Sequence, residues 1–146
     1  STLPVIGNGD LHQAHQVKAR LGKTNCKALM IARGCLRNPF IFLEAYTKEN
    51  SNHSLFDGND YFEVIERLLD YTTKHYSNER IRLVQMRKLI VWFAAGFPHV
   101  AKFRGNMFAA KELDTVMKLA QEFFHTLGAT PKQINYDEVF MNGGHG

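Results

Sequence analysis

Cysteine, proline and long hydrophobic runs are scarce in this chain of 146 residues, which has two cysteines and four prolines. Cys26 and Cys35 match no zinc-binding spacing, and one pair is too few for the disulfide framework of a small secreted domain. We therefore expect reduced thiols in a cytoplasmic protein. No apolar run approaches the roughly 18–20 residues that span a bilayer. The N-terminal STLPVIGNGD also lacks the basic start of a secretory signal.

Acidic side chains are almost absent from residues 79–111, where Glu79 stands against seven lysines and arginines. The formal net charge of the whole chain is +4, and this stretch alone carries +6. Residues 1–78 add +1, and residues 112–146 subtract 3. Such a concentration of positive charge indicates a surface that faces a polyanion. A solvated helix face is the alternative, and the charge pattern alone does not separate the two.

The N-terminal part of the chain alternates between short apolar runs and amphipathic segments. LPVIG (3–7) predicts a strand, Ala14, Val17 and Leu21 predict a helix over 11–21, and KALMIA (27–32) predicts a second strand. A strand, a helix and a strand in this order imply two parallel neighbours with a right-handed crossover. Another helix is expected over residues 40–48, opened by Pro39, because proline suits the first helical turn.

Beyond the polar stretch at residues 48–54 the pattern becomes helical. Asp60 and Glu63 resemble a capping box at the start of a helix over 60–76. Three further helices with short connections follow, which predicts a small bundle. These three helices are expected over residues 79–95, 98–108 and 113–127, with Gly128 ending the last one.

The domain organisation follows from these patterns. Residues 1–53 form an α/β part, residues 54–128 form a helical bundle, and residues 129–146 form an irregular, loosely held tail without periodicity. The chain as a whole is therefore expected to be mostly helical.

Two turns follow the two predicted strands: Asn8-Gly9-Asp10 follows the first and Ala32-Arg33-Gly34 follows the second. Parallel neighbouring strands place such turns side by side. Their glycines let backbone N–H groups approach an oxyanion, and the arginine offers a bidentate fork to the same group. In a (β/α)8 barrel this face commonly carries a phosphate site. For each turn alone, ordinary turn chemistry is the alternative, with Asp10 also serving as a helix cap. The candidate phosphate-binding residues are Asn8, Gly9, Asp10, Ala32, Arg33 and Gly34.

The segment PVIGNGD, the helix after it and ALMIARGCLRNPFIF resemble the end of the barrel in the tRNA-dihydrouridine synthases. That family shows a PVIANGD-like strand end and a MIGRGALGNPW-like segment. Other flavin barrels, such as the old-yellow-enzyme type, end in a similar way. IRLVQMRKLIVWFAAGFPHVAKFR favours the RNA-modifying family, because it resembles that family's helical domain. Residues 3–43 and 80–127 carry the resemblance.

The resemblance implies a fold and an activity. The fold would be the last βα units of a TIM-type α/β barrel, followed by an all-α helical bundle that binds tRNA. The activity would be reduction of uridine in tRNA to 5,6-dihydrouridine with FMN, which NADPH reduces. In this family hydride passes to C6 of the base and a cysteine protonates C5. The candidate phosphate-binding residues would hold the FMN phosphate, with Ala32 standing where the family usually has glycine.

The resemblance places no catalytic residue in this chain. The proton-donating cysteine of the family lies earlier in the barrel, and neither Cys26 nor Cys35 matches it. We therefore expect the chain alone to be inactive and the missing N-terminal part of the barrel to be its partner. Two alternatives stay open: another FMN-dependent TIM-barrel oxidoreductase that acts on a small substrate, or a non-catalytic RNA-binding fragment.

The basic stretch fits recognition of tRNA phosphates, which reads shape rather than sequence. Trp92 and Phe93 are expected in the core rather than stacked on bases. His12 and His15 lack a carboxylate or cysteine partner at metal-binding spacing, so no metal site is expected. Arg87, Lys88 and Arg104 match basic positions of the family's helical domain. The candidate RNA-binding residues are Arg80, Arg82, Arg87, Lys88, Lys102 and Arg104.

Overall fold

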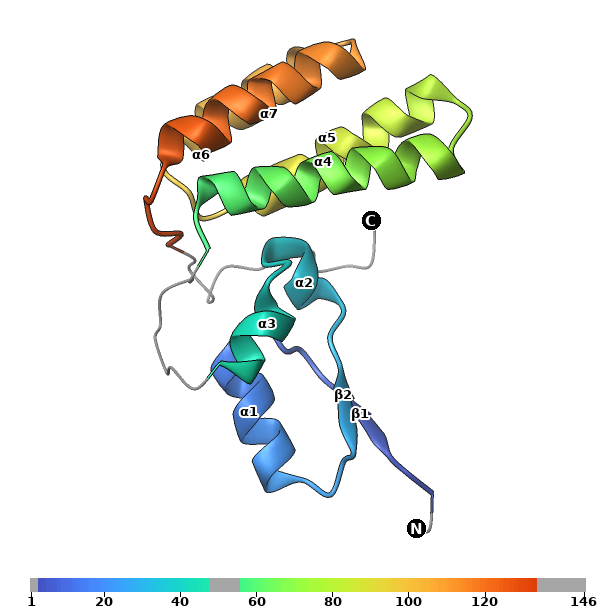
Figure 1. The fold of residues 1–146 in the computed structure, drawn as a ribbon, viewed down its shortest axis with the longest axis vertical. Helices are drawn as coiled ribbons and strands as arrows, with labels where there is room; N and C mark the ends of the chain where they lie inside the picture. The colour runs from blue at the N-terminus through green and yellow to red at the C-terminus, as the bar shows by residue number, and fades with distance from the viewer. Residues whose placement is uncertain (1–2, 48–55, 134–146) are drawn as a thin grey trace. The chain divides into compact units, whose positions relative to one another are not determined.

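The computed structural model describes residues 3–47 and 56–133, and the chain divides into two compact units (Figure 1). The described part of the first unit is residues 3–47, and that of the second is residues 56–133. Helices make up most of these residues, as the sequence predicts. In the part of the chain that the structure describes, no helix is both long and apolar enough to cross a membrane.

The first unit has two short parallel strands with a helix between them, as predicted. Strand β1 pairs with β2 so that Ile6 lies opposite Ala28 and Asn8 opposite Met30. Both strands are shorter than expected, because pairing extends over three residues of each. The elements of this unit are β1 (Ile6–Asn8), α1 (Ala14–Lys23), β2 (Ala28–Met30), α2 (Arg33–Arg37) and α3 (Ile41–Tyr46).

The core of the first unit lies where α1 packs on β2 and α3. Val17 on α1 is buried, as its place in the predicted apolar stripe requires. Leu21, which has the same helical spacing, is 42% exposed, so the buried stripe does not reach the end of α1. The buried cluster comprises Leu11, Val17, Ile31 and Ile41.

Helix α1 does not begin as the sequence predicts. Its N-cap is Gln13 rather than Asp10, which lies in the turn with φ of 34°. The Gln16 side chain takes over the capping role, because its Oε1 accepts the N–H groups of His12 (2.9 Å) and Gln13 (3.1 Å). Asp10 is therefore not used as a cap and belongs to the turn after β1.

Helix α3 also begins later than the proline signal suggests. Its first residue is Ile41, and Pro39 precedes the N-cap residue Phe40 instead of opening the first turn. The side chain of Asn38 holds this entry: Oδ1 accepts the N–H of Phe40 at 3.0 Å, and Nδ2 donates to Glu44 Oε2 at 2.7 Å. The Asn-Pro pair thus fixes the start of α3 through the side chain of Asn38.

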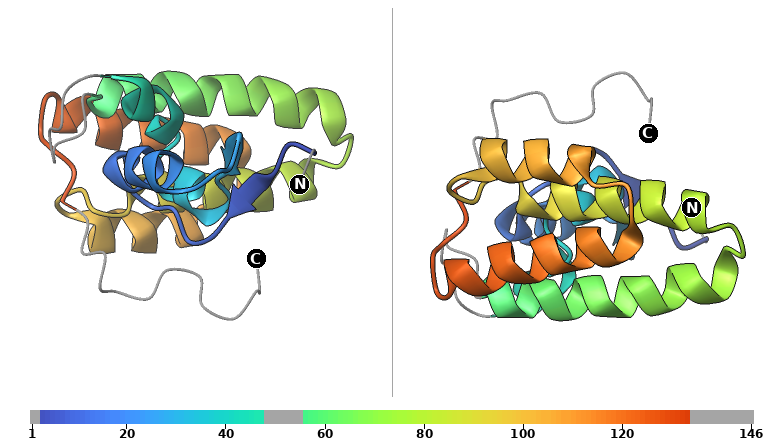
Figure 2. Two further views of the ribbon diagram at one scale, coloured as in Figure 1. Left: turned by 90° about the horizontal axis from the view of Figure 1, so that it is seen from below. Right: turned by 90° about the horizontal axis from the view of Figure 1, so that it is seen from above.

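The second unit is a helical bundle built from four helices among its described residues. Helices α4, α5 and α7 pack against one another, and α6 packs on α5 and α7; Figure 2 shows these helices side-on. Tyr61 is fully buried at the centre, stacked on Phe124 with ring centroids 6.1 Å apart. The helices are α4 (Gly58–His75), α5 (Glu79–Ala94), α6 (Val100–Ala109) and α7 (Leu113–Leu127).

The start of α4 lies two residues earlier than predicted. Asp57 is the N-cap, and its Oδ1 accepts the N–H groups of Asn59 (2.8 Å) and Asp60 (3.2 Å). Asp60 completes the box by accepting the N–H of Asp57 at 2.8 Å. The predicted pairing of Asp60 with Glu63 is therefore wrong, because Asp60 is the third helical residue rather than the cap.

The segment after α7 is better anchored than the sequence suggests. Residues 129–133 have no regular structure, but Lys132 is buried and its Nζ donates to the Phe93 carbonyl at 2.9 Å. The ammonium also lies 4.7 Å from the ring centroid of Tyr61. The expectation of a loosely held tail is wrong for these residues, and residues 134–146 lie outside the described part.

Candidate functional site

The turns after β1 and β2 meet around a cavity of about 370 Å³ in the first unit. All six candidate phosphate-binding residues line this cavity, together with two residues that the sequence reasoning did not include. We call this set the phosphate corner. Its residues are Asn8, Gly9, Asp10, Leu11, His12, Ala32, Arg33 and Gly34.

Backbone geometry brings the two turns of the phosphate corner together. Gly9 has φ of 154° and Asp10 has φ of 34°, so the chain turns sharply after β1. Gly34 lies against the next stretch of this turn: a Cβ placed on it would come within 2.0 Å of the Leu11 carbonyl oxygen and 3.2 Å of His12 Cα. The sequence suggested that this glycine lets an oxyanion approach. The structure shows a further role for this glycine, which is close contact with the backbone of Leu11.

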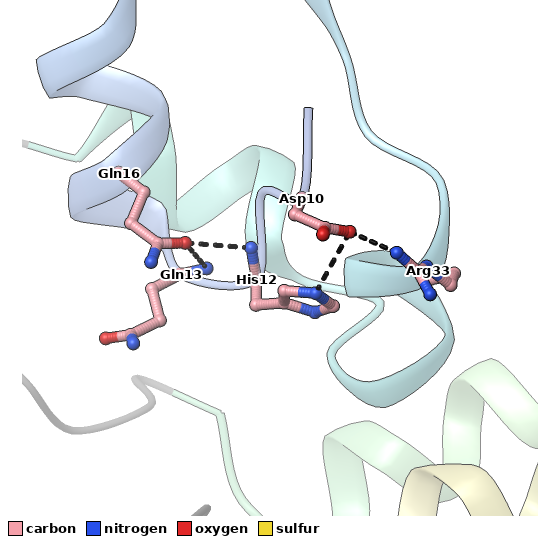
Figure 3. Close-up of polar contacts among 5 residues, drawn as sticks. All are labelled: Asp10, His12, Gln13, Gln16 and Arg33. Carbon is pink, nitrogen blue, oxygen red and sulfur yellow. Dashed lines mark hydrogen bonds and ion pairs between the residues drawn. The ribbon is translucent and has the colours of Figure 1, made fainter. Parts of the chain in front are cut away.

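Three ionisable side chains meet at the phosphate corner (Figure 3). The Asp10 carboxylate pairs with the Arg33 guanidinium, and the same oxygen lies 3.8 Å from His12 Nε2. The carboxylate is 71% exposed, while the His12 side chain is only 22% exposed. Burial lowers the pKa of His12 from its ordinary value of 6.5, and Arg37 and Arg33 act in the same direction. Asp10 opposes them, so the net shift is downward.

A phosphate group fits the chemistry of the corner. The Arg33 guanidinium supplies positive charge and a planar fork, and the cavity is large enough for the group. His12 Nδ1 is buried without a hydrogen-bond partner among the described residues, which leaves a polar atom for a ligand to satisfy. The Asp10 carboxylate opposes an anion, but its pairing with Arg33 offsets that repulsion.

Helix dipoles contribute less to the corner than the sequence suggests. Helix α2 has only five residues, and the amides before α1 already donate to Gln16 Oε1. The expected support from helix N-termini is therefore weak, because such support comes from unsatisfied N–H groups of the first turn. Arg33 and His12 are the groups that make the corner attractive to an anion.

Neither cysteine has the environment of a reactive thiol. Cys35 Sγ lies 2.9 Å from the Ala32 carbonyl oxygen, and burial raises the pKa of the thiol. Cys26 is half-buried beside Gly7, where a Cβ would come within 2.9 Å of its sulfur. Both positions fit structural thiols. Among the described residues, no group of three or more His, Cys, Asp or Glu side chains could hold a metal ion.

The candidate RNA-binding residues lie on two helices that contact each other, α5 and α6. Arg80, Lys102 and Arg104 are exposed, while Arg82 and Lys88 are half-buried. Phe93 is buried, as expected for a core residue. Trp92 is only half-buried and lies under Lys88, whose Nζ is 4.8 Å from the ring centroid. The expectation of a core position is therefore only partly met for Trp92.

Arg87 has a structural contact that its sequence pattern does not reveal. Its Nη1 donates to the carbonyls of Phe108 (3.3 Å) and Ala110 (3.1 Å), at the C-terminal end of α6. A guanidinium in this place satisfies carbonyls that have no partner within the helix. Arg87 thus joins α5 to the end of α6, whatever further contact its remaining N–H groups make.

We expect Arg87→Ala to lower the free energy of unfolding by about 1–2 kcal/mol, because two carbonyls lose a charged donor. Arg104→Ala is the matched control, since Arg104 is exposed on α6 and its loss should change stability by less than about 0.5 kcal/mol. Urea unfolding followed by circular dichroism measures both. Equal stabilities of the two variants would refute the structural role of Arg87.

The family model and the similar proteins that match this chain point to the same family. The family model described as dihydrouridine synthase matches residues 1–127. A probable tRNA-dihydrouridine synthase of Mycobacterium leprae is 31% identical over 116 residues, which cover 77% of this chain and 30% of that protein. The probable tRNA-dihydrouridine synthase of Rickettsia conorii is 28% identical over 138 residues, covering 89% of this chain and 40% of that protein. The chain thus spans between 30% and 40% of the length of these curated relatives.

Proposed function

This chain belongs to the dihydrouridine synthase family, and on that premise we propose that the full-length protein reduces uridine to 5,6-dihydrouridine in tRNA. The observation that carries the proposal is the family match over residues 1–127, which includes both the phosphate corner and the basic helices. Relatives named as probable tRNA-dihydrouridine synthases support it. Within this protein the chain supplies binding surfaces rather than the proton-donating cysteine.

The first unit is proposed to be the last part of a TIM-type barrel. Its parallel strands and the helix between them support this assignment. So do the apolar side chains on and beside the strands, which a neighbouring strand or helix would cover. The exposed fractions are 76% for Leu3, 68% for Ile6 and 52% for Met30.

The phosphate corner is proposed to hold the phosphate of FMN, with NADPH as the reductant of the flavin. When bound, FMN would supply the hydride for the reduction. Arg33 would bind the phosphate through its guanidinium, and Asp10 would orient that group. The turn of Asn8 and Gly9 and the start of α2 would close around the group. These residues fix the position of the cofactor and perform no step of the reaction.

The contacting helices α5 and α6 are proposed to form the tRNA-facing surface. Residues 79–111 carry seven cations and one acidic side chain, and this excess suits a phosphate backbone. Arg87 stays in the proposal, because a guanidinium has five N–H donors and two carbonyls do not use them all. The proposed contacts come from Arg80, Arg82, Arg87, Lys88, Lys102 and Arg104.

The activity is tested on the purified full-length protein. It should carry FMN, and its oxidation of NADPH should depend on tRNA that lacks dihydrouridine, with the new base detected by mass spectrometry. Fully modified tRNA is the control and should not stimulate the reaction. NADPH oxidation with a small unsaturated ketone but not with tRNA would identify a small-substrate flavoenzyme. A protein that binds tRNA but no flavin would identify a non-catalytic RNA-binding protein.

The tRNA surface is tested with charge pairs in the 146-residue chain. Lys102→Ala/Arg104→Ala should weaken tRNA binding about tenfold at low salt and reduce the salt slope by about 1 to 2, as expected for lost phosphate contacts. Arg67→Ala/Lys74→Ala on α4 removes the same charge from another exposed helix face and should have little effect. Filter binding across a salt series measures both. Equal losses for the two pairs would indicate attraction by net charge and contradict the α5–α6 surface.

A further inference from the structure

His12 belongs to the phosphate corner although the sequence pattern gave it no role there. It follows the turn of Asn8, Gly9 and Asp10 and precedes the first residue of α1. Its side chain is 22% exposed and lines the cavity, while His15, three residues later, is exposed. The backbone of Leu11 and His12 is held in place by Gly34, whose Cα packs directly on it. The backbone that carries the imidazole is therefore fixed by packing.

The two ring nitrogens of His12 have different surroundings. Nε2 lies 3.8 Å from the Asp10 carboxylate oxygen, and Nδ1 is buried without a hydrogen-bond partner among the described residues (Figure 3). A neutral imidazole has one donor and one acceptor, whereas a protonated ring has two donors. A protonated His12 could therefore donate to Asp10 with one nitrogen and leave the other for an anion. That pattern suits a carboxylate and a phosphate on either side of the ring.

The charges around His12 disfavour this protonated form while the corner holds no anion. Arg33 and Arg37 repel a charged imidazole, Asp10 attracts it, and burial penalises the charge most. The result is a pKa below the ordinary value of 6.5, so the ring is mostly neutral at pH 7. A phosphate dianion would reverse the balance, since it adds two negative charges beside a ring that has one carboxylate neighbour.

We propose that His12 takes up a proton when the phosphate of FMN enters the corner, so that cofactor binding is coupled to the protonation of this one side chain. The inference rests on the proposed function, because it requires the phosphate to bind beside Arg33. It adds a residue and a pH dependence that the family match does not supply. The proton comes from solvent, and no covalent bond changes.

The direction of the pH effect follows from the two pKa values. If binding raises the pKa of His12, FMN binds most tightly below the pKa of the free chain and loses affinity as the pH rises through the pKa of the complex. A rise of about one unit corresponds to a change in affinity of about tenfold across this window. The phosphate itself loses its second proton near pH 6, which acts in the opposite direction at low pH. The experiment therefore follows the imidazole directly.

The test is an NMR titration of the histidine ring signals of the 146-residue chain from about pH 5 to about pH 9, without ligand and with saturating FMN. Riboflavin, which has the isoalloxazine ring but no phosphate, is the ligand control. His12→Gln identifies the signal of His12 among the seven histidines. His15→Gln is the matched protein control, since it removes an exposed histidine of α1 outside the corner.

We expect FMN to raise the pKa of His12 by about one unit and riboflavin to leave it unchanged. His12→Gln should abolish the decline in FMN affinity between the pKa of His12 in the free chain and its pKa in the complex, while His15→Gln should keep that tenfold decline. FMN that shifts the amide signals of Gly9 and Gly34 without moving the pKa of His12 would overturn the proton coupling alone. Absence of these amide shifts would overturn the phosphate corner as the FMN site and the inference with it.

Discussion

Replacing Gly34 by alanine should open the phosphate corner and destabilise the first unit, whereas alanine at Gly22 should leave both intact. A Cβ at residue 34 would lie 2.0 Å from the Leu11 carbonyl oxygen and 3.1 Å from its carbon. Both atoms are backbone, so relief requires moving α2 away from the turn that follows β1. We expect a loss of about 3 kcal/mol, at the upper end of what overpacking costs.

Gly22→Ala is a matched control for this change. Gly22 lies in the last turn of α1, and a Cβ there would meet no atom within 4 Å. Because alanine has the higher helix propensity, this variant should gain up to about 0.5 kcal/mol. Hydrogen exchange of the amides in α1 and β2 measures the stability of the first unit in both variants.

The loss at Gly34 should also appear in cofactor binding. Displacing α2 separates Arg33 from the Asp10 turn, so FMN affinity should fall by more than about tenfold. Fluorescence quenching of FMN measures this affinity. Gly34→Ala with unchanged exchange rates and unchanged FMN binding would show that the contact with Leu11 does not hold the corner together.

The sequence predicts which residues belong to the phosphate corner better than it predicts the contacts that these residues make. Glycine, asparagine and aspartate after an apolar run mark a turn, and two parallel strands bring such turns together, so six of the eight cavity-lining residues could be predicted. The close packing of Gly34 on Leu11 could not, because it depends on the path of backbone 23 residues apart in the chain.

His12 shows the same limit for a side chain. Its spacing from His15 drew attention to metal binding, since both residues would share a face if the helix began at residue 11. The helix begins at Ala14, which leaves His12 in the turn and directs it to Asp10. The available signal was the position of His12 two residues after Asp10 of the Asn-Gly-Asp turn, and only the placement of the N-cap at Gln13 gives it meaning.

The bounds of a helix could be predicted from the sequence where its apolar residues repeat over several turns. Helix α7 has the predicted bounds, because its apolar stripe runs from Val116 to Leu127. Helix α5 differs from its predicted bounds by one residue at its end, and its buried residues lie from Met86 onward. The five-residue helix α2 was not predicted, since one turn is too short to show a period. The structural contact of Arg87 was equally hidden, because its partners Phe108 and Ala110 lie on the next helix.

Alanine at Gly58 should destabilise the second unit by about 3 kcal/mol, the other large effect that the structure predicts. Gly58 is the first residue of α4, and a Cβ there would lie 2.1 Å from the Phe124 carbonyl oxygen and 3.2 Å from Leu127 Cβ. The Gly58 N–H also donates to the Gly128 carbonyl at 3.1 Å. The start of α4 thus rests on the end of α7, and an added methyl group must force the two apart.

The damage should extend from this contact into the aromatic core. Tyr61 lies one turn further along α4 and stacks on Phe124 at an interplanar angle of 5°, so moving α4 disturbs the stack at the centre of the bundle. Urea unfolding and the near-ultraviolet circular dichroism of the aromatic side chains should both report the change in Gly58→Ala.

Gly105→Ala separates this packing effect from the general effect of replacing a helical glycine. Gly105 lies inside α6, and a Cβ there would meet no atom within 4 Å, so the variant should gain about 1 kcal/mol from helix propensity. The two variants carry the same chemical change and should move stability in opposite directions. If Gly58→Ala is instead as stable as Gly105→Ala, the close approach of α4 to α7 does not exist in solution. The tRNA surface on α5 and α6 would then rest on a differently packed bundle.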